Sequence, residues 1–249
     1  MQSFRRLALL LALGLPAIPA ILAQSSSSSS ATPDAPQQPA ATTQPQANLS
    51  VQARIRARRE QRRAAALHEV YGHEYEGYFG MAYLRFEPGA TLERAHEYGW
   101  NPGFTRYFSE RLGVTLDGRG YYGSAYVYNN AVTNSAITNA EVSQYSVLIG
   151  PSYRFYMQPK FSVSGRVMGG MSYGNFSGDT SGSTKLSTAL GLWPNAAVFA
   201  ASAAIIGEYN LTPEVGLRIT PEYYPTGFGG TIQNNLGFTG SIAYRFGKR

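Results

Sequence analysis

The sequence lacks cysteine, is poor in charge, and has no apolar run of the length and continuity of a helical membrane span. The absence of cysteine among its 249 residues excludes disulfides, thiolate metal sites, c-type haem attachment and a cysteine nucleophile. Charged residues make up 14% of the chain, against about 25% in a typical globular domain. The longest apolar run, residues 7–23, is interrupted by Pro16 and Pro19. Because each helical span needs about 20 apolar residues, a membrane protein built from several helices is excluded.

The first 23 residues have the pattern of an export signal. Arg5 and Arg6 form a basic start, residues 7–15 are apolar, and Ala20 and Ala23 offer small residues for cleavage. An uncleaved anchor helix is the alternative, which the shortness of the segment and its two prolines disfavour. We therefore expect the mature chain to work outside the cytoplasm.

The net charge of +6 is concentrated in one segment. Residues 50–67 contribute +5, whereas acidic and basic residues balance from His68 to the end of the chain. The basic character therefore belongs to this segment alone. Nucleic-acid binding, the usual interpretation of a basic patch, is disfavoured for an exported protein.

Two segments separate the export signal from the rest of the chain. Residues 24–49 are rich in Ser, Pro and Gln and predict a disordered linker. Residues 50–68 are rich in Ala and Arg, without Gly or Pro, and predict a short, mostly exposed basic helix. This basic segment carries Arg54, Arg56, Arg58, Arg59, Arg62 and Arg63. Three interpretations remain open: a solvated helix face, a contact with anionic membrane lipid, and a contact with cell-wall polymer.

From Tyr75 onward, apolar residues recur at every second position, which is typical of β-strands. Eight strands are predicted, over residues 75–85, 100–108, 112–126, 144–155, 161–173, 197–210, 215–223 and 235–246. Short and long connections alternate between them, as in outer-membrane barrels. We therefore expect residues 69–249 to form an eight-stranded antiparallel up-and-down β-barrel, with both ends of the chain on the side of the short turns.

A period of two does not decide which face of the barrel is inside, and a soluble lipocalin-like barrel is the alternative. Aromatic residues on the apolar face recur 10 to 12 residues apart, which corresponds to about 25–30 Å along a membrane normal. The opposite face is built mainly from small residues. We therefore predict a membrane barrel with its apolar face outward. The predicted membrane-interface aromatics are Trp100, Tyr145, Phe155, Phe161, Tyr173, Phe199, Tyr209, Tyr223 and Phe246.

Charged residues on the polar face are expected to point into the lumen. An eight-stranded barrel is only about wide enough for its own side chains, so these charges should pair and fill the interior. An ion path or a gate made by exchanging pairs is the functional alternative. The predicted lumen charge network consists of Glu76, Asp117, Arg119, Arg154, Arg166, Glu208, Arg218, Glu222 and Arg245.

The residues resemble the small eight-stranded outer-membrane barrels of the OmpA and OmpX type. The resemblance rests on the rhythm of strands and turns, on GWNPGFTRYFSERLGVTLDGRGYY at residues 99–122, and on GSIAYRF at residues 240–246. It implies a transmembrane barrel in the outer membrane of a Gram-negative-type bacterium, with both termini in the periplasm. It also implies contacts with outer-membrane lipid and lipopolysaccharide. Phe246, near the end of the last strand, resembles the signal that the barrel-assembly machinery recognises.

The fold leaves several functions open. We expect a monomeric, non-catalytic protein with a structural or surface-interaction role and without cofactor or metal. A narrow porin-like channel is the alternative. A lipid-acting outer-membrane enzyme is the third possibility, since His96 in the first long loop could meet Asp179 and Ser181 of the third loop.

Overall fold

A computed structural model describes residues 50–128, 131–134, 136–178 and 183–248, so the predicted export signal and linker lie outside the described residues. Its two helices are α1 (Val51–Tyr71) and α2 (Thr184–Ala189), and a 3-10 turn covers Phe228–Gly230. The strands are β1 (His73–Phe86), β2 (Ala95–Tyr107), β3 (Leu112–Tyr126), β4 (Asn139–Met157), β5 (Phe161–Asn175), β6 (Ala196–Asn210), β7 (Val215–Thr226) and β8 (Gln233–Lys248).

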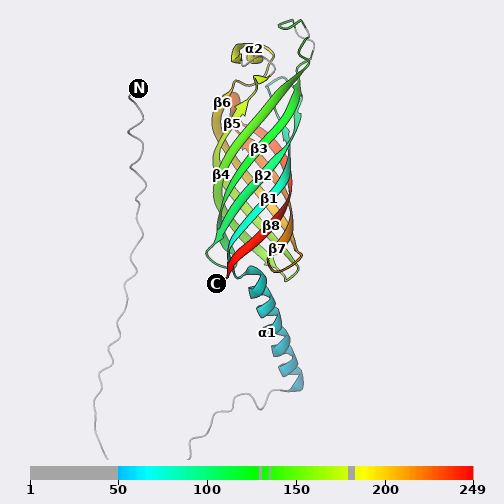
Figure 1. Cartoon of the computed structure of the whole chain (residues 1–249), viewed down its shortest axis with the longest axis vertical. Coiled ribbons are helices and arrows are strands. Elements are labelled where there is room, and N and C mark those ends of the chain that lie inside the picture. The colour runs from blue at the N-terminus through cyan, green and yellow to red at the C-terminus, as the bar shows by residue number, and fades with distance from the viewer. Residues whose placement is uncertain (1–49, 129–130, 135, 179–182, 249) are drawn as a thin grey trace, which may run out of the picture. The chain divides into compact units, whose positions relative to one another are not determined.

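The eight strands form one closed antiparallel barrel in sequence order, which confirms the predicted fold (Figure 1). Each strand pairs with the next along the chain, and β8 closes the barrel against β1, with Glu76 opposite Arg245. Closure satisfies the backbone hydrogen bonds of what would otherwise be two edge strands. Among the described residues, no helix has both the length and the apolar character needed to cross a membrane.

The two ends of the barrel differ in their connections. Residues 108–111, 158–160 and 211–214 form short turns at one end, which we call the turn end, where α1 enters and the chain terminates (Figure 1). Residues 87–94, 127–138, 176–195 and 227–232 form the longer connections at the other, the loop end. The predicted alternation of short and long connections is therefore present.

The apolar face of the strands points outward. In β4, Gln144, Ser146 and Leu148 are buried in the interior, whereas Tyr145 and Val147 between them are exposed. Val147 is 61% exposed and Val167 on β5 is 62% exposed. A soluble barrel would bury these side chains, so the wall has the inverted arrangement that the sequence predicts.

The predicted interface aromatics lie on this outward face in two groups. Trp100, Tyr145, Tyr173, Phe199 and Tyr223 lie toward the loop end, and Phe155, Phe161, Tyr209 and Phe246 toward the turn end. All of them are exposed except Trp100, which is half-buried beside Gly120. The wall between the two groups is apolar, as in barrels with two aromatic girdles.

Several boundaries differ from the sequence prediction, and strand β4 begins at Asn139, five residues before its predicted start at Gln144. Strand β2 begins at Ala95, five residues before the predicted start, so His96 lies in a strand and not in the first long loop. Its first residues place the charged Glu97 inward and His96 outward, which hides the apolar period of two. Helix α1 continues to Tyr71, three residues beyond the predicted end of the basic segment, and its last two residues are buried.

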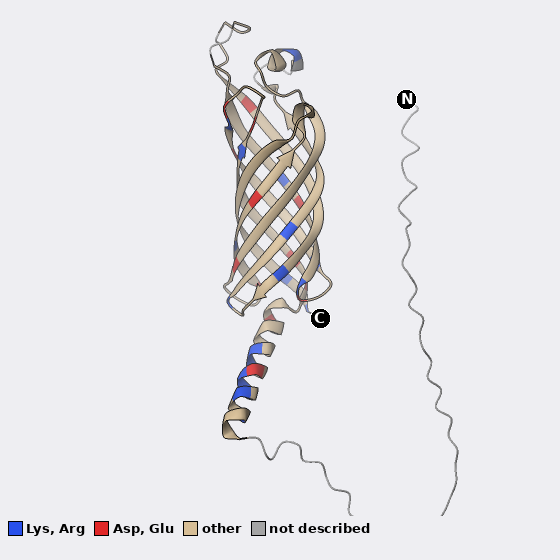
Figure 2. Cartoon of the chain, turned by 180° about the vertical axis from the view of Figure 1, so that it is seen from behind, with Lys and Arg blue, Asp and Glu red and all other residues tan. Residues whose placement is uncertain are grey.

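Helix α1 owes its formation to its composition and its first turn. Ala and Arg have high helix propensity, and the Ser50 hydroxyl accepts a hydrogen bond from the Ala53 N–H at 3.3 Å. The six arginines of the basic segment are all exposed, and basic positions recur along the helix (Figure 2). Most of α1 therefore lies free of the barrel wall.

Candidate functional site

The candidate site is the network of charged side chains inside the barrel. All nine predicted lumen charges are buried, and each has at least one ion-pair partner within the set. The strands position them at alternate residues of the inward face. They form two groups at different depths, which we call the turn-end cluster and the middle cluster.

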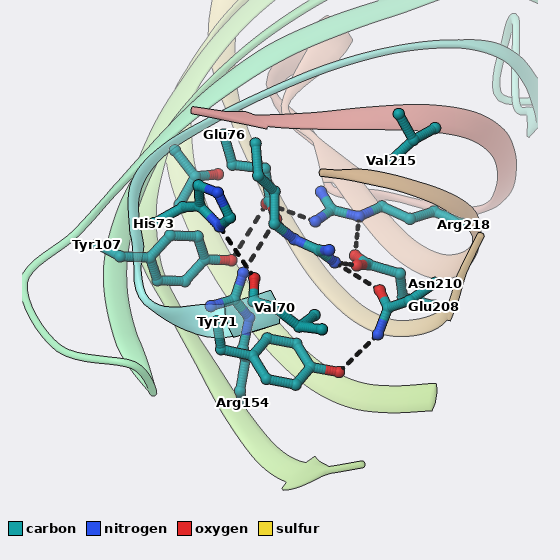
Figure 3. A network of polar contacts seen from close by, with 12 residues as sticks. Val70, Tyr71, His73, Glu76, Tyr107, Arg154, Glu208, Asn210, Val215 and Arg218 are labelled. Atoms are coloured by element: carbon teal, nitrogen blue, oxygen red, sulfur yellow. Dashed lines mark hydrogen bonds and ion pairs between the residues drawn. The ribbon is translucent and has the colours of Figure 1, made fainter. Parts of the chain in front are cut away.

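Glu76 is the centre of the turn-end cluster (Figure 3). Its Oε2 atom lies 2.9 Å from Arg154 Nη2 and 3.1 Å from Arg245 Nε, and its Oε1 atom pairs with Arg218. The Tyr107 hydroxyl donates to Oε1 at 3.2 Å. One carboxylate on β1 thus joins arginines from β4, β7 and β8 across the full width of the lumen.

Glu208 on β6 completes the turn-end cluster. It pairs with Arg218 and Arg245. Glu208 and Arg218 are direct cross-strand partners in the β6–β7 ladder. The cluster holds three arginines and two carboxylates, so one positive charge remains without an acidic counterpart among these five residues.

Backbone carbonyls and aromatic rings surround the excess positive charge. Arg154 Nη1 donates to the Glu110 carbonyl at 3.1 Å, and Arg245 Nη1 donates to the Pro213 carbonyl at 3.2 Å. The Arg154 guanidinium also lies 3.6 Å from the centre of the Tyr107 ring. Such contacts stabilise a desolvated cation, so the excess charge is stabilised without a further acid among the described residues.

The middle cluster joins Asp117, Arg119, Arg166 and Glu222. Arg119 lies between two carboxylates, with Nε 2.5 Å from Asp117 Oδ1 and Nη1 2.8 Å from Glu222 Oε1. Arg166 Nη1 lies 3.3 Å from Asp117 Oδ2. The Ser202 hydroxyl donates to Glu222 Oε2 at 2.8 Å. This group is neutral and links β3, β5, β6 and β7.

Tyr78 connects the two clusters. Its hydroxyl donates to Asp117 and accepts from Arg166, and the Arg218 guanidinium lies 5.5 Å from the ring centre. The ring crosses the space above Gly103, where an added Cβ would lie 2.0 Å from it. Glycine at this position therefore allows the tyrosine to lie across the lumen.

The end of α1 closes the turn end of the barrel (Figure 3). The Tyr71 hydroxyl donates to the Gln158 carbonyl at 2.8 Å and accepts from Asn210 Nδ2 at 2.9 Å. The guanidinium groups of Arg154 and Arg245 lie 5.0 and 5.4 Å from its ring centre. Tyr71 is 1% exposed. This residue, which the sequence analysis did not single out, caps the charged interior.

The loop end of the interior is filled by apolar side chains instead. Phe86, Phe176 and Phe228 pack against one another with ring centres 5.2 to 5.9 Å apart. Leu190 and Leu192 of the third long connection are buried in the same cluster. We call this group the loop-end cluster. Both ends of the lumen are therefore occupied by buried side chains.

A buried acid that pairs with no arginine in the described part of the chain lies near the loop end. Glu97 on β2 has no exposed surface, and it accepts hydrogen bonds from Gln144 Nε2 at 3.1 and 2.9 Å. The apolar period of two predicts this strand only from Trp100, with residues 87–99 in a loop, so Glu97 is absent from the predicted lumen network. An extension of the period of two through Glu97 and Gly99 would have placed the side chain inside.

The residues considered for a lipid-acting enzyme are only partly described. His96 lies on the outward face of β2, and its Nδ1 atom is 2.6 Å from the Tyr83 hydroxyl. Asp179 and Ser181 lie outside the described residues. Within the described part of the chain, no three His, Asp or Glu side chains are grouped as metal ligands would be. The buried polar side chains of the interior therefore mainly pair with one another and fill the lumen.

No known protein family and no curated protein matches the sequence, whereas solved structures match the fold. The neisserial surface protein A NspA is 12% identical, with a TM-score of 0.51, over 70% of this chain and 97% of that chain. Ail of Yersinia pestis (16% identity, TM-score 0.46) and OprG of Pseudomonas aeruginosa (11%, 0.46) are also similar. The match to Ail covers 70% of this chain and the match to OprG covers 72%, and each covers 99% of the other chain. The chain therefore has the fold of the small eight-stranded outer-membrane barrels.

Proposed function

We propose that the protein is a non-catalytic, monomeric anchor in the outer membrane of a Gram-negative-type bacterium, which displays long loops on one side and a basic helix on the other. The observation that carries this proposal is the combination of an apolar outward wall between two aromatic groups with an interior filled by paired charges. The apolar wall is suited to contact with lipid, and the filled interior opposes the passage of ions. The filled interior favours an anchor over the narrow channel.

The position of α1 supports a periplasmic turn end. An exported chain that inserts from the periplasm keeps its extension and its short turns on that side. The loop end would then face the exterior, where the four long connections are available to partners. The exposed Phe246 near the end of β8 fits recognition by the barrel-assembly machinery, and the apolar wall fits contact with outer-membrane lipid and lipopolysaccharide.

The arginines of α1 support a contact with a polyanion in the periplasm. The helix is attached by its last turn, and residues 54–63 are exposed about two to five turns away from Tyr71. At 1.5 Å per residue, Arg54 lies about 25 Å along the helix from Tyr71. We therefore favour an acidic cell-wall polymer over the lipid surface as the partner of the basic segment.

Refolding tests the membrane assignment. The full chain should fold in detergent or vesicles, with heat-modifiable migration on gels, and should not stay folded and soluble without an amphiphile. Val147→Arg places a charge on the lipid face near mid-wall and should destabilise the barrel by about 3 kcal/mol. Val132→Arg in a long connection is the matched control and should have little effect. A wild-type chain that is soluble and folded without lipid contradicts the proposal.

Binding to cell-wall material tests the role of α1. Folded full-length protein in detergent should sediment with isolated peptidoglycan at low salt and dissociate as salt rises, because exposed charges are screened. Replacement of the six arginines by Gln should abolish the interaction and leave barrel folding intact. Equal sedimentation of this variant and the wild type would refute the role, and binding to anionic vesicles alone would favour the lipid surface.

A further inference from the structure

We infer that the outward wall carries a specific site for a membrane lipid with a phosphate headgroup, formed by Arg85 and an apolar groove across β4–β8. The inference rests on the proposed membrane location and adds a defined ligand site to it. It depends on two features of the wall that meet at one residue, Leu236.

The first feature is a cation on the lipid-facing wall. Arg85 on β1 is exposed and points outward two ladder positions beyond Tyr83, which pairs with Tyr98. Tyrosines of this kind mark the level where acyl chains give way to headgroups. In contrast to Arg106, which pairs with Glu74 at 2.9 Å, Arg85 has no ion-pair partner among the described residues. A headgroup phosphate is the anion available at this level.

Neighbouring side chains add to the polar end of the site. His96 is the cross-strand partner of Arg85, and its ring stacks on Tyr83 with centres 5.8 Å apart. On the other side, Arg94 Nη1 donates to the Asn234 carbonyl at 3.1 Å. The nearby acid Glu87 pairs with Arg94 at 3.8 Å. Arg85 thus remains available for a phosphate oxygen.

The second feature is an open apolar groove of about 830 Å³. Its lining includes Gly165, Val167, Ala203 and Pro221, together with Tyr153 and Phe155 of β4. Small residues on β5 and β6 create the depression between larger neighbours. The volume falls within the range of about 300–1,000 Å³ that is usual for ligand pockets.

One row of cross-strand partners connects the groove to the cation. Val167 pairs with Ala203, Ala203 with Tyr223, and Tyr223 with Leu236. Leu236 lines the groove and is also the partner of Arg85. Because strands in such barrels are tilted, this row climbs from the middle of the wall toward the loop end. An acyl chain in the groove would therefore place its headgroup at Arg85.

Lipid titration of the folded full chain in detergent, read by native mass spectrometry, tests the site. The probes are dioleoyl phosphatidic acid, dioleoylglycerol with the same acyl chains, and inorganic phosphate. Wild-type protein should bind phosphatidic acid at least tenfold more tightly than dioleoylglycerol, and inorganic phosphate should not displace it. Arg85→Gln should weaken binding of phosphatidic acid by about tenfold, the size expected for one charge-assisted hydrogen bond. Ala203→Trp, which fills the groove, should weaken it similarly.

Two matched variants control for general effects. Arg106→Gln removes an outward arginine at the turn end, and Leu116→Trp adds a ring to the wall on β3. Neither should change the affinity for phosphatidic acid. Unchanged affinity in Arg85→Gln or Ala203→Trp, displacement by inorganic phosphate, or equal losses in the controls would overturn the inference. Insertion into vesicles is scored separately by gel migration, so a failure of the membrane assignment is distinguishable from a failure of the site.

Discussion

The two halves of the barrel interior are filled by different chemistry. The turn end and the middle of the lumen hold the charged clusters and the ring of Tyr71, whereas the loop end holds the aromatic residues Phe86, Phe176 and Phe228 and the uncompensated Glu97. Charges on the strands meet across the lumen because the ladder fixes their depth. The apolar residues come partly from the long connections, which fold inward. A narrow barrel can therefore be closed at one end by ion pairs between strand residues and at the other by apolar packing of residues from the long connections.

Removal of the central carboxylate should give the largest effect. Glu76→Gln leaves Arg154, Arg218 and Arg245 with only Glu208 as a carboxylate in the turn-end cluster. Breaking a buried ion pair by removing one partner costs about 3–5 kcal/mol. Because three arginines lose this partner, we expect the free energy of unfolding to fall by about 5 kcal/mol. Urea unfolding in vesicles, followed by tryptophan fluorescence, measures it. Glu60→Gln on the exposed helix is the control, and equal stability of the two variants would refute the role of Glu76.

Truncation in the loop-end cluster should cost somewhat less. Phe228 is fully buried against Phe86 and Phe176, and a buried Phe→Ala change costs about 3–5 kcal/mol through lost burial and the cavity left behind. We expect about 3 kcal/mol for Phe228→Ala, because the loop side can partly relax. The outward Phe238→Ala is the matched control in the same unfolding assay. A loss in Phe238→Ala as large as in Phe228→Ala would indicate that the loop-end cluster contributes little.

Coupling between Glu208 and Arg218 should be smaller, because the network has alternative partners. Glu208 keeps Arg245 when Arg218 is removed, and Arg218 keeps Glu76 when Glu208 is removed. We expect the summed losses in unfolding free energy of Glu208→Ala and Arg218→Ala to exceed the loss of the double variant by about 1–2 kcal/mol. A double-mutant cycle in the same urea assay measures this difference. Additive losses would mean that these two side chains do not act as a pair.

The smallest effect is expected at the cap. Tyr71→Phe removes a hydroxyl that donates to the Gln158 carbonyl and accepts from Asn210. Because Asn210 Nδ2 still donates to the Pro159 carbonyl, one buried hydrogen bond is lost without replacement, which costs about 1 kcal/mol. Tyr156→Phe on the outward wall is the control and should be neutral. Thermal unfolding in detergent detects a difference of this size. Loss of folding in Tyr71→Phe would mean that the cap is required for the barrel to close.

Residues in regular strands were predictable, and residues at boundaries were not. The neighbour relation of Glu208 and Arg218 follows from counting residues to a tight turn, because a β-ladder has a fixed rise. Tyr71 could not be found in this way, since its partners Gln158 and Asn210 are distant in sequence and an aromatic residue at a helix end has no periodic signal. The contacts of Phe176 and Phe228 depend on how long connections fold, which local patterns do not encode.

Conductance tests the central claim, that both halves of the interior are filled, most directly. Single-channel recording of the refolded full chain in planar bilayers should show no steady conductance for the wild type, because Tyr71 and the charged clusters close one end and the loop-end cluster closes the other. Stable open-channel currents from heat-modifiable, folded wild-type protein would contradict the filled interior and support the narrow-channel alternative.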